Sequence, residues 1–429
     1  MEHTELVSAA IISGALLTAC STVDEAPAQK TATATDVVSQ YVSIAQSNYG
    51  DSLNTAKTLD TAIKALLDAP SEESLAAAKS AWIEARVPYQ QTEAYRFGNA
   101  YVDDWEGKVN AWPLDEGLID YVDASYGTES DENPYYAANI IANPKLNVGG
   151  VEVDASSITP ALLSEQLQEI DEVESNVATG YHAIEFLLWG QDLNGTNQGA
   201  GARPATDFSL ENCTNGNCDR RREYLQAAST LLISDLEDIV AAWTADGEAT
   251  KQLLAKGDNG GLSTMLTGMG SLSYGELAGE RIKLGLMLHD PEEEHDCFAD
   301  NTHASHFNDA LGIRNIYLGS YTKVSGEVVD GASLSDLVAA KDAELDQEMR
   351  NKLDVTMSAM QVMVDEANKG NTFDVLIGEG NAEGNKVIQD VVDALVDQTK
   401  TIEKIVVALN LEEIEVEGSD SLDNPSAVL

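Results

Sequence analysis

A histidine and a glutamate three positions apart are the residues of this chain best suited to chemistry. His182 and Glu185 interrupt an otherwise apolar run, Gly-Tyr-His-Ala-Ile-Glu-Phe-Leu-Leu-Trp-Gly, at residues 180–190. Positions i and i+3 of a helix share a face, so both side chains point the same way out of a segment that its neighbours bury. Burying such a pair costs free energy unless a hydrogen-bond network or a metal ion satisfies it. We therefore interpret the pair as a metal-binding site.

Two ligands do not make a tight metal site, because zinc takes three or four and iron or calcium takes more. Acidic and imidazole side chains elsewhere in the chain are candidates to complete the set: Glu93, Asp115, Glu116, Glu276, His295, Asp300 and His303. An oxygen-rich set with one or two imidazoles suits iron, with zinc or calcium as alternatives, and a thiolate site is not indicated.

Two polar stripes recur at helical spacing and could line the same pocket. Arg86, Glu93 and Arg96 lie in one stripe with Trp82 and Tyr89. Ser273 and Glu276 begin a second stripe that continues through Glu280 and Lys283. A stripe at this spacing is normally the buried face of a helix. A salt-bridged face that only fixes helix packing is the other interpretation of both stripes.

Five blocks in this chain resemble conserved motifs of the imelysin-like family, which carries a peptidase label (M75) and includes iron-regulated proteins. They contain Arg86-Val-Pro-Tyr89, Asn110-Ala-Trp-Pro-Leu-Asp115-Glu116, Gly180-x-His182-x-x-Glu185, Ser271-Leu-Ser273-Tyr-Gly-Glu276 and Glu292-Glu-Glu-His295-Asp. The resemblance implies a helical protein, built as a duplicated bundle, that captures or handles iron or a metal complex at the cell envelope. Envelope iron-transport proteins are the partners that it implies.

A metal-dependent peptidase is the alternative function, and it rests on the resemblance. The zincin motif His-Glu-x-x-His is absent, and Phe186 after Glu185 rules out the inverted His-x-x-Glu-His form. No Gly-x-Ser-x-Gly nucleophile elbow occurs either. These absences favour binding over catalysis, and we assign no catalytic residue.

The elements that must position these residues are helices. Apolar residues recur at three and four positions along several segments: 37–67, 71–97, 161–189, 220–243, 273–288, 334–368 and 385–410. A capping Ser71 followed by two acids predicts one helix start, and Pro88 predicts a kink. Strand signals are limited to short pieces at 148–153 and 326–329. Segments 98–160, 190–218 and 289–333 are predicted to be loop-rich.

We predict an all-α fold with two helical bundles packed in series and long irregular loops. Residues 36–245 form the N-terminal bundle that carries the Gly-x-His-x-x-Glu motif, and residues 246–429 form the C-terminal bundle. The chain of 429 residues is long enough for cores in both.

Residues 1–35 are predicted to be a lipoprotein signal and a flexible tether. A short apolar stretch ends in Leu17-Thr-Ala-Cys20, similar to a bacterial lipobox with Cys20 as the acylated residue, although no base precedes the stretch. Cys213 and Cys218 close a small disulfide loop if the protein is exported. The expected location is the periplasm or outer membrane, with the membrane reached only through the lipid anchor.

The charge of the chain excludes one class of partner. It has 73 acidic and 25 basic residues, a formal net charge of −48. Nucleic acid is not an expected partner, because phosphate binding needs a basic surface. A solvated acidic surface explains the charge, and a field that concentrates cations near a site is physically allowed.

Overall fold

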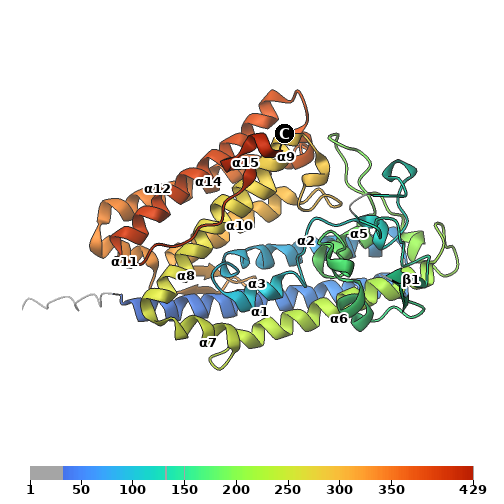
Figure 1. The fold of residues 1–429 in the computed structure, drawn as a ribbon, viewed down its shortest axis with the longest axis horizontal. Coiled ribbons are helices and arrows are strands. Elements are labelled where there is room, and N and C mark those ends of the chain that lie inside the picture. The colour runs from blue at the N-terminus through green and yellow to red at the C-terminus, as the bar shows by residue number, and fades with distance from the viewer. Residues whose placement is uncertain (1–31, 131–132, 149, 429) are drawn as a thin grey trace, which may run out of the picture. The chain divides into compact units, whose positions relative to one another are not determined.

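Three long amphipathic helices organise the N-terminal half of the structure, a computed structural model. It describes residues 32–130, 133–148 and 150–428. Helix α1 (Ala34–Asp68) packs against both α2 (Glu72–Gln90) and α6 (Cys218–Ala242) (Figure 1). Ser71 caps α2 by accepting a hydrogen bond from the backbone N–H of Ser74, which confirms the predicted helix start.

Short elements connect these helices and build the walls of the site. In chain order they are η1 (Glu93–Tyr95), α3 (Ala100–Glu106), η2 (Glu116–Leu118), η3 (Ala124–Tyr126), β1 (Lys145–Val148), β2 (Val151–Asp154), α4 (Pro160–Leu162), η4 (Leu163–Leu167), η5 (Ile170–Glu172), α5 (Gly180–Trp189) and η6 (Ala205–Phe208). Strands β1 and β2 form an antiparallel hairpin, with Lys145 opposite Asp154. A disulfide joins Cys213 to Cys218 at the start of α6.

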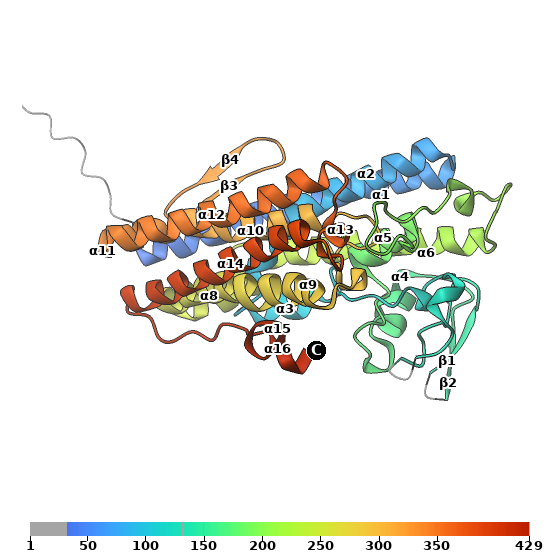
Figure 2. The same cartoon turned by 90° about the horizontal axis from the view of Figure 1, so that it is seen from above.

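A second set of long helices forms the C-terminal half. Helix α14 packs against α12 and against η7, and α10 packs against α12 (Figure 2). The elements are α7 (Glu248–Ala255), α8 (Gly257–Ser271), η7 (Leu272–Lys283, a π-helix), α9 (Leu284–Leu288), η8 (Pro291–Glu293), α10 (Thr302–Leu318), β3 (Ser320–Thr322), β4 (Val328–Asp330), α11 (Leu334–Lys341), α12 (Ala343–Ala367), α13 (Phe373–Ile377), α14 (Ala382–Ala408), α15 (Asp420–Asp423) and α16 (Pro425–Val428).

Glycines allow the two sets of helices to approach closely. A Cβ atom at Gly268 of α8 would lie 2.0 Å from the carbonyl oxygen of Ala94, and one at Gly312 of α10 would lie 2.5 Å from that of Gln91. Backbone of the C-terminal half therefore rests directly on the segment that follows α2. Residues 32–429 form one compact unit, and the proposed boundary near residue 245 stays a prediction.

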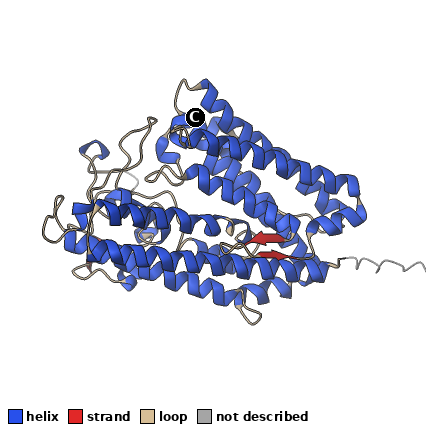
Figure 3. Cartoon of the chain, turned by 180° about the vertical axis from the view of Figure 1, so that it is seen from behind, coloured by secondary structure: helices blue, strands red, loops and turns tan. Residues whose placement is uncertain are grey.

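The all-α fold with long loops is confirmed, and strands occur only as short hairpins in the described residues (Figure 3). No described helix combines the length and apolar character needed to cross a bilayer. The predicted lipidation site, Cys20, lies outside the described residues.

Two predicted elements are wrong, and a third, the helix at 71–97, ends earlier than predicted. The 289–333 segment is not mainly loop, because α10 occupies Thr302–Leu318. The predicted helix at 161–189 is broken, since Glu169 and Asp171 adopt left-handed backbone angles and α5 begins only at Gly180. Pro88 precedes the end of α2 at Gln90, so Glu93 and Arg96 lie beyond the helix and not on a continued stripe.

Candidate functional site

Gly180 places the motif helix against a neighbouring loop. Its φ is +76°, and a Cβ atom there would lie 2.4 Å from the carbonyl oxygen of Val109. The next residue, Tyr181, donates its backbone N–H to that same oxygen at 2.7 Å. A side chain at position 180 would break this contact, so the glycine of the motif fixes where α5 starts. Every residue of α5 is buried.

His182 and Glu185 form a buried hydrogen-bonded pair on α5. Nδ1 of His182 lies 2.9 Å from Oε2 of Glu185, and the other carboxylate oxygen accepts the backbone N–H of Ala299 at 3.0 Å. Burial and the nearby Arg86 lower the pKa of His182 to about 3, so its ring is neutral at pH 7. Glu185 thus orients the ring, and Nε2 of His182 is buried without a hydrogen-bond partner.

Arg86 and Asp296 form an ion pair next to this histidine. An Nη2–Oδ1 distance of 2.9 Å joins them, and Arg86 also donates to Asn110 at 2.5 Å. Burial opposes the charge of Arg86, but Asp296 and Glu185 outweigh it and raise its pKa. The second oxygen of Asp296 accepts hydrogen bonds from Ser305 and Asn301. The arginine charge is therefore neutralised locally.

His295 lies between His182 and Arg86. Its ring centroid is 4.8 Å from that of His182, and its Nε2 lies 3.1 Å from Nη2 of Arg86. Nδ1 of His295 is buried without a partner. Ligand atoms of His182, His295 and Asp296 all lie within 4.8 Å of one another. Three groups that can hold a metal are thus gathered from α5 and from the segment before α10.

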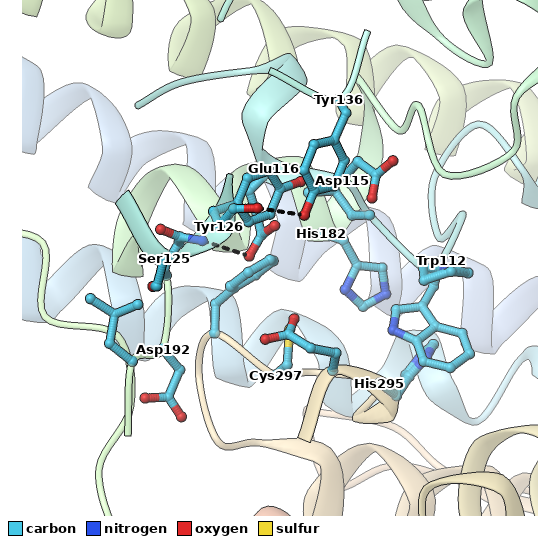
Figure 4. A pocket seen from close by; sticks show the side chains of 16 residues that line it. Trp112, Asp115, Glu116, Ser125, Tyr126, Tyr136, His182, Asp192, His295 and Cys297 are labelled. Carbon is cyan, nitrogen blue, oxygen red and sulfur yellow. Dashed lines mark hydrogen bonds between the residues drawn. The ribbon is translucent and has the colours of Figure 1, made fainter. Parts of the chain in front are cut away.

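His182 and His295 open onto a cavity of about 370 Å³, which we call the histidine cavity (Figure 4). Side chains that line it include Trp112, Asp115, Glu116, Asp192, Glu292 and Cys297. Burial, followed by the charge of Glu116, raises the pKa of Glu292 to about 7. Burial also raises the pKa of Glu116. The lining is therefore rich in carboxylates that repel one another.

A second cavity, of about 430 Å³, shares Trp112 and His295 with the histidine cavity as lining residues. Residues from both predicted polar stripes line this cavity, among them Arg96 and Glu276. Arg281 donates to Glu276 at 2.9 Å and also pairs with Glu93. We call this second space the arginine cavity.

The structure brings some of the predicted site residues together and separates others. His182, Asp115, Glu116 and His295 line the histidine cavity. Glu93, Arg96 and Glu276 belong to the ion-pair network beside the arginine cavity. Ser273 is fully buried elsewhere and accepts a hydrogen bond from Gln398 of α14 at 2.7 Å.

Sequence reasoning missed a cluster that holds the cavity wall in place. Asp120 accepts hydrogen bonds from Arg203 at 2.7 Å and from Arg221 at 2.6 Å, with all three side chains buried. Arg221 lies on α6, and Asp120 follows the loop that carries Asp115 and Glu116. Asp296 was also missed, although it directly follows His295 in the chain. The position of Asp296 next to His295, among polar residues of a predicted long loop, is the signal that could have indicated it.

Comparisons with known proteins agree on one family. The family model named Imelysin, peptidase M75, matches residues 45–402. Iron-regulated protein A of Synechococcus elongatus is 24% identical over 293 residues, covering 66% of this chain. The chain spans 61% of that relative, less than two thirds of its length.

Two solved structures share the fold. One, from Parabacteroides distasonis and described as an iron-regulated protein A precursor, has a TM-score of 0.61 at 20% identity, covering 88% of this chain and 95% of that one. The other, an imelysin-like protein of Psychrobacter arcticum, has a TM-score of 0.55 at 16% identity, covering 89% and 97%.

Proposed function

This chain belongs to the imelysin family, and on that premise we propose that it binds a metal ion or small metal complex, with iron as the metal, in the histidine cavity. Its role is the uptake or handling of iron at the cell envelope. The name of its relative, iron-regulated protein A, supports iron over zinc or calcium.

One observation carries the proposal: His182 is oriented by Glu185 while its Nε2 has no partner. The Nδ1–Oε2 distance of 2.9 Å fixes the ring, and Nε2 is buried at the cavity. A metal-ligating histidine characteristically donates its other ring N–H to a carboxylate in this way. When Nδ1 donates to Glu185, Nε2 carries the lone pair that a metal accepts.

The donor set of the cavity fits a hard or borderline ion. His182 offers an imidazole nitrogen, and Asp115, Glu116 and Glu292 offer carboxylates; His295 would join them if its Nε2 exchanged Arg86 for the metal. Iron accepts both kinds of ligand. A bound cation would supply the positive charge that the repelling carboxylates lack, and these residues would hold it.

The size of the cavity favours a metal complex or a hydrated ion over a bare one. A water molecule takes about 30 Å³ of liquid volume, whereas the histidine cavity has about 370 Å³. That volume lies within the range of roughly 300–1,000 Å³ typical of small-molecule pockets. Small chelators that bring iron with them fit this space.

Export and lipid anchoring complete the proposal. The disulfide between Cys213 and Cys218 supports an oxidising compartment such as the periplasm. Cys20 is the proposed acylated residue, which would tether the protein to the membrane and bring it near envelope iron-transport partners.

The test is elemental analysis of the purified protein after incubation with ferric citrate, zinc or calcium and desalting. Wild type is compared with His182→Gln and with the control His289→Asn. His289 lies outside the histidine cavity, where its Nδ1 contacts the carbonyl of Ile377, and asparagine tolerates its left-handed backbone. We expect iron near one equivalent in wild type and control and a loss in His182→Gln. Equal iron in all three proteins would contradict the proposal.

The peptidase label of the family is tested with the same proteins. Both oxygens of Glu185 already have hydrogen-bond partners, Nδ1 of His182 and the backbone N–H of Ala299, so this side chain is placed to orient a ring and not to activate water. Chelator-sensitive cleavage of an unfolded protein substrate by wild type, lost in His182→Gln, would replace binding with hydrolysis.

A further inference from the structure

Three aspartates from distant parts of the chain meet outside the histidine pair. One carboxylate oxygen each from Asp192, Asp300 and Asp374 lies within 4.8 Å of the others. Asp192 follows the motif helix α5, Asp300 precedes α10, and Asp374 lies in the first turn of α13. We call them the aspartate cluster.

The burial of Asp374 sets this cluster apart from acidic groups on a surface. Its side chain is 0% exposed, and neither of its carboxylate oxygens has a hydrogen-bond partner. Asp300 is 9% exposed, and its Oδ1 is also unpartnered. A buried carboxylate without a donor or counter-charge is costly, so such a group takes up a proton or gains a positive partner.

No base in the described part of the chain supplies that partner. None of the ion pairs among the described residues includes Asp192, Asp300 or Asp374. Glu294 is a further acidic side chain near the cluster: it is 1% exposed, and its Oε1 is unpartnered as well. Burial, followed by the charges of Asp374 and Asp300, raises its pKa. A cation from solution is the partner that would keep these carboxylates ionised.

We propose that the aspartate cluster binds a hard divalent cation, Ca²⁺, at a site distinct from the His182–His295 pair. All three donors are carboxylate oxygens, which is the ligand type that Ca²⁺ takes. Ca–O distances of about 2.3–2.6 Å put oxygens on opposite sides of the ion about 5 Å apart, so the spread of the cluster accommodates it. Asp192 is partly exposed and gives the ion a path and water ligands.

The ion would fasten the loop after the motif helix to the C-terminal half. Residues of this loop already lie on the segment around α13: Gln198 packs at Gly370 and Thr196 at Gly378. Asp192 also lines the histidine cavity, so the ion would order one of its walls. The site is therefore structural, and it does not depend on whether iron binds at His182.

The experiment is a Ca²⁺ titration of the full chain after treatment with a chelator, followed by melting temperature and by calorimetry. We compare wild type with Asp374→Asn and with the control Asp246→Asn, which removes one exposed charge between α6 and α7. We expect one equivalent of Ca²⁺ to raise the melting temperature of wild type and control by several degrees. In Asp374→Asn, the affinity should fall at least tenfold, while the metal-free protein should melt above metal-free wild type.

Asp374→Asn should have these two opposite effects because Asp374 has two roles. It is an unpaired buried charge, so its removal stabilises the metal-free protein, and it is a proposed ligand, so its removal weakens Ca²⁺ binding. Unchanged Ca²⁺ affinity in Asp374→Asn, or no response in wild type, would overturn the proposal. His182→Gln separates the two sites, because it should keep the Ca²⁺ response while losing iron. A Ca²⁺ response lost in His182→Gln and kept in Asp374→Asn would place the ion in the histidine cavity and would also overturn it.

Discussion

Arg86 of α2 and Asp296 of the segment before α10 form an ion pair 2.9 Å long, across 210 positions of sequence, with both side chains at most 1% exposed. It links the N-terminal helices to the segment that carries His295. Asp296 also compensates the charge of Arg86, which lies directly beside His295.

Removing one partner of this pair should cost much of the stability of the protein. Arg86→Ala leaves Asp296 buried without its counter-charge, and we expect a loss of about 3–5 kcal/mol in the free energy of unfolding. Urea denaturation measures it. The control is Arg314→Ala, whose pair with Asp354 is exposed and should contribute at most about 1 kcal/mol. Equal losses in both variants would contradict the buried-pair argument.

Glu185→Gln should weaken metal binding without unfolding the protein. Glutamine has nearly the same shape and can still contact Nδ1 of His182, but its amide can donate to Nδ1 or accept from it, so it fixes the ring tautomer less strictly. Changes to such an orienting residue weaken metal affinity roughly 10–100-fold. Iron titration by calorimetry, with circular dichroism as the control for folding, tests this. Wild-type affinity in the variant would show that Glu185 does not orient the ligand.

Cation affinity of the histidine cavity should rise with pH. Burial and the charge of Glu116 raise the pKa of Glu292 to about 7, so its carboxyl is mainly protonated at pH 6 and mainly ionised at pH 8. A protonated carboxyl is a poor ligand for a cation, and tighter iron-citrate binding at pH 8 is the expected result. The dependence should flatten in Glu292→Gln. A wild-type affinity that is flat across this range would contradict the role of Glu292.

Asp120 should stabilise the folded protein at neutral pH and lose this effect in acid. Burial opposes its charge, but Arg203 and Arg221 outweigh burial and lower its pKa below the ordinary value of 3.8. A lowered folded-state pKa contributes stability that is complete above the unfolded value and is lost as pH falls through the folded one. Asp120→Asn should therefore cost about 3–5 kcal/mol at pH 7. Below pH 3.8 the difference in the free energy of unfolding between wild type and Asp120→Asn should narrow, and thermal melts measure this difference.

Helices with a clear apolar stripe were predictable from sequence, and α10 was not. Helices α1, α6, α12 and α14 bury one face and expose the other, so their apolar residues recur regularly. Helix α10 instead buries polar residues, among them His306, Asn308 and Asp309. Their burial depends on partners from other helices, such as Arg281 beside Asp309. Local periodicity carries no information about such partners.

Part of the candidate site was also predictable. His182 stood out because an imidazole and a carboxylate share one face of an apolar helix. Placing Glu93 and Arg96 beside it assumed that α2 continues, but this helix ends at Gln90. Glu93 pairs with Arg281 and Arg96 pairs with Glu276, and the resulting network borders a different cavity. Which of two adjacent cavities a side chain enters depends on where helices end, and sequence patterns define those ends poorly.

The fluorescence of Trp112 gives the protein an intrinsic signal for occupancy of the histidine cavity. Its ring lies against His295, with centroids 5.5 Å apart, and it lines both cavities. The other four tryptophans, Trp82, Trp105, Trp189 and Trp243, are buried in the core. A ferric ion near Trp112 should quench its fluorescence, and Trp112→Phe should remove that response. Occupancy could then be followed in real time without any attached dye.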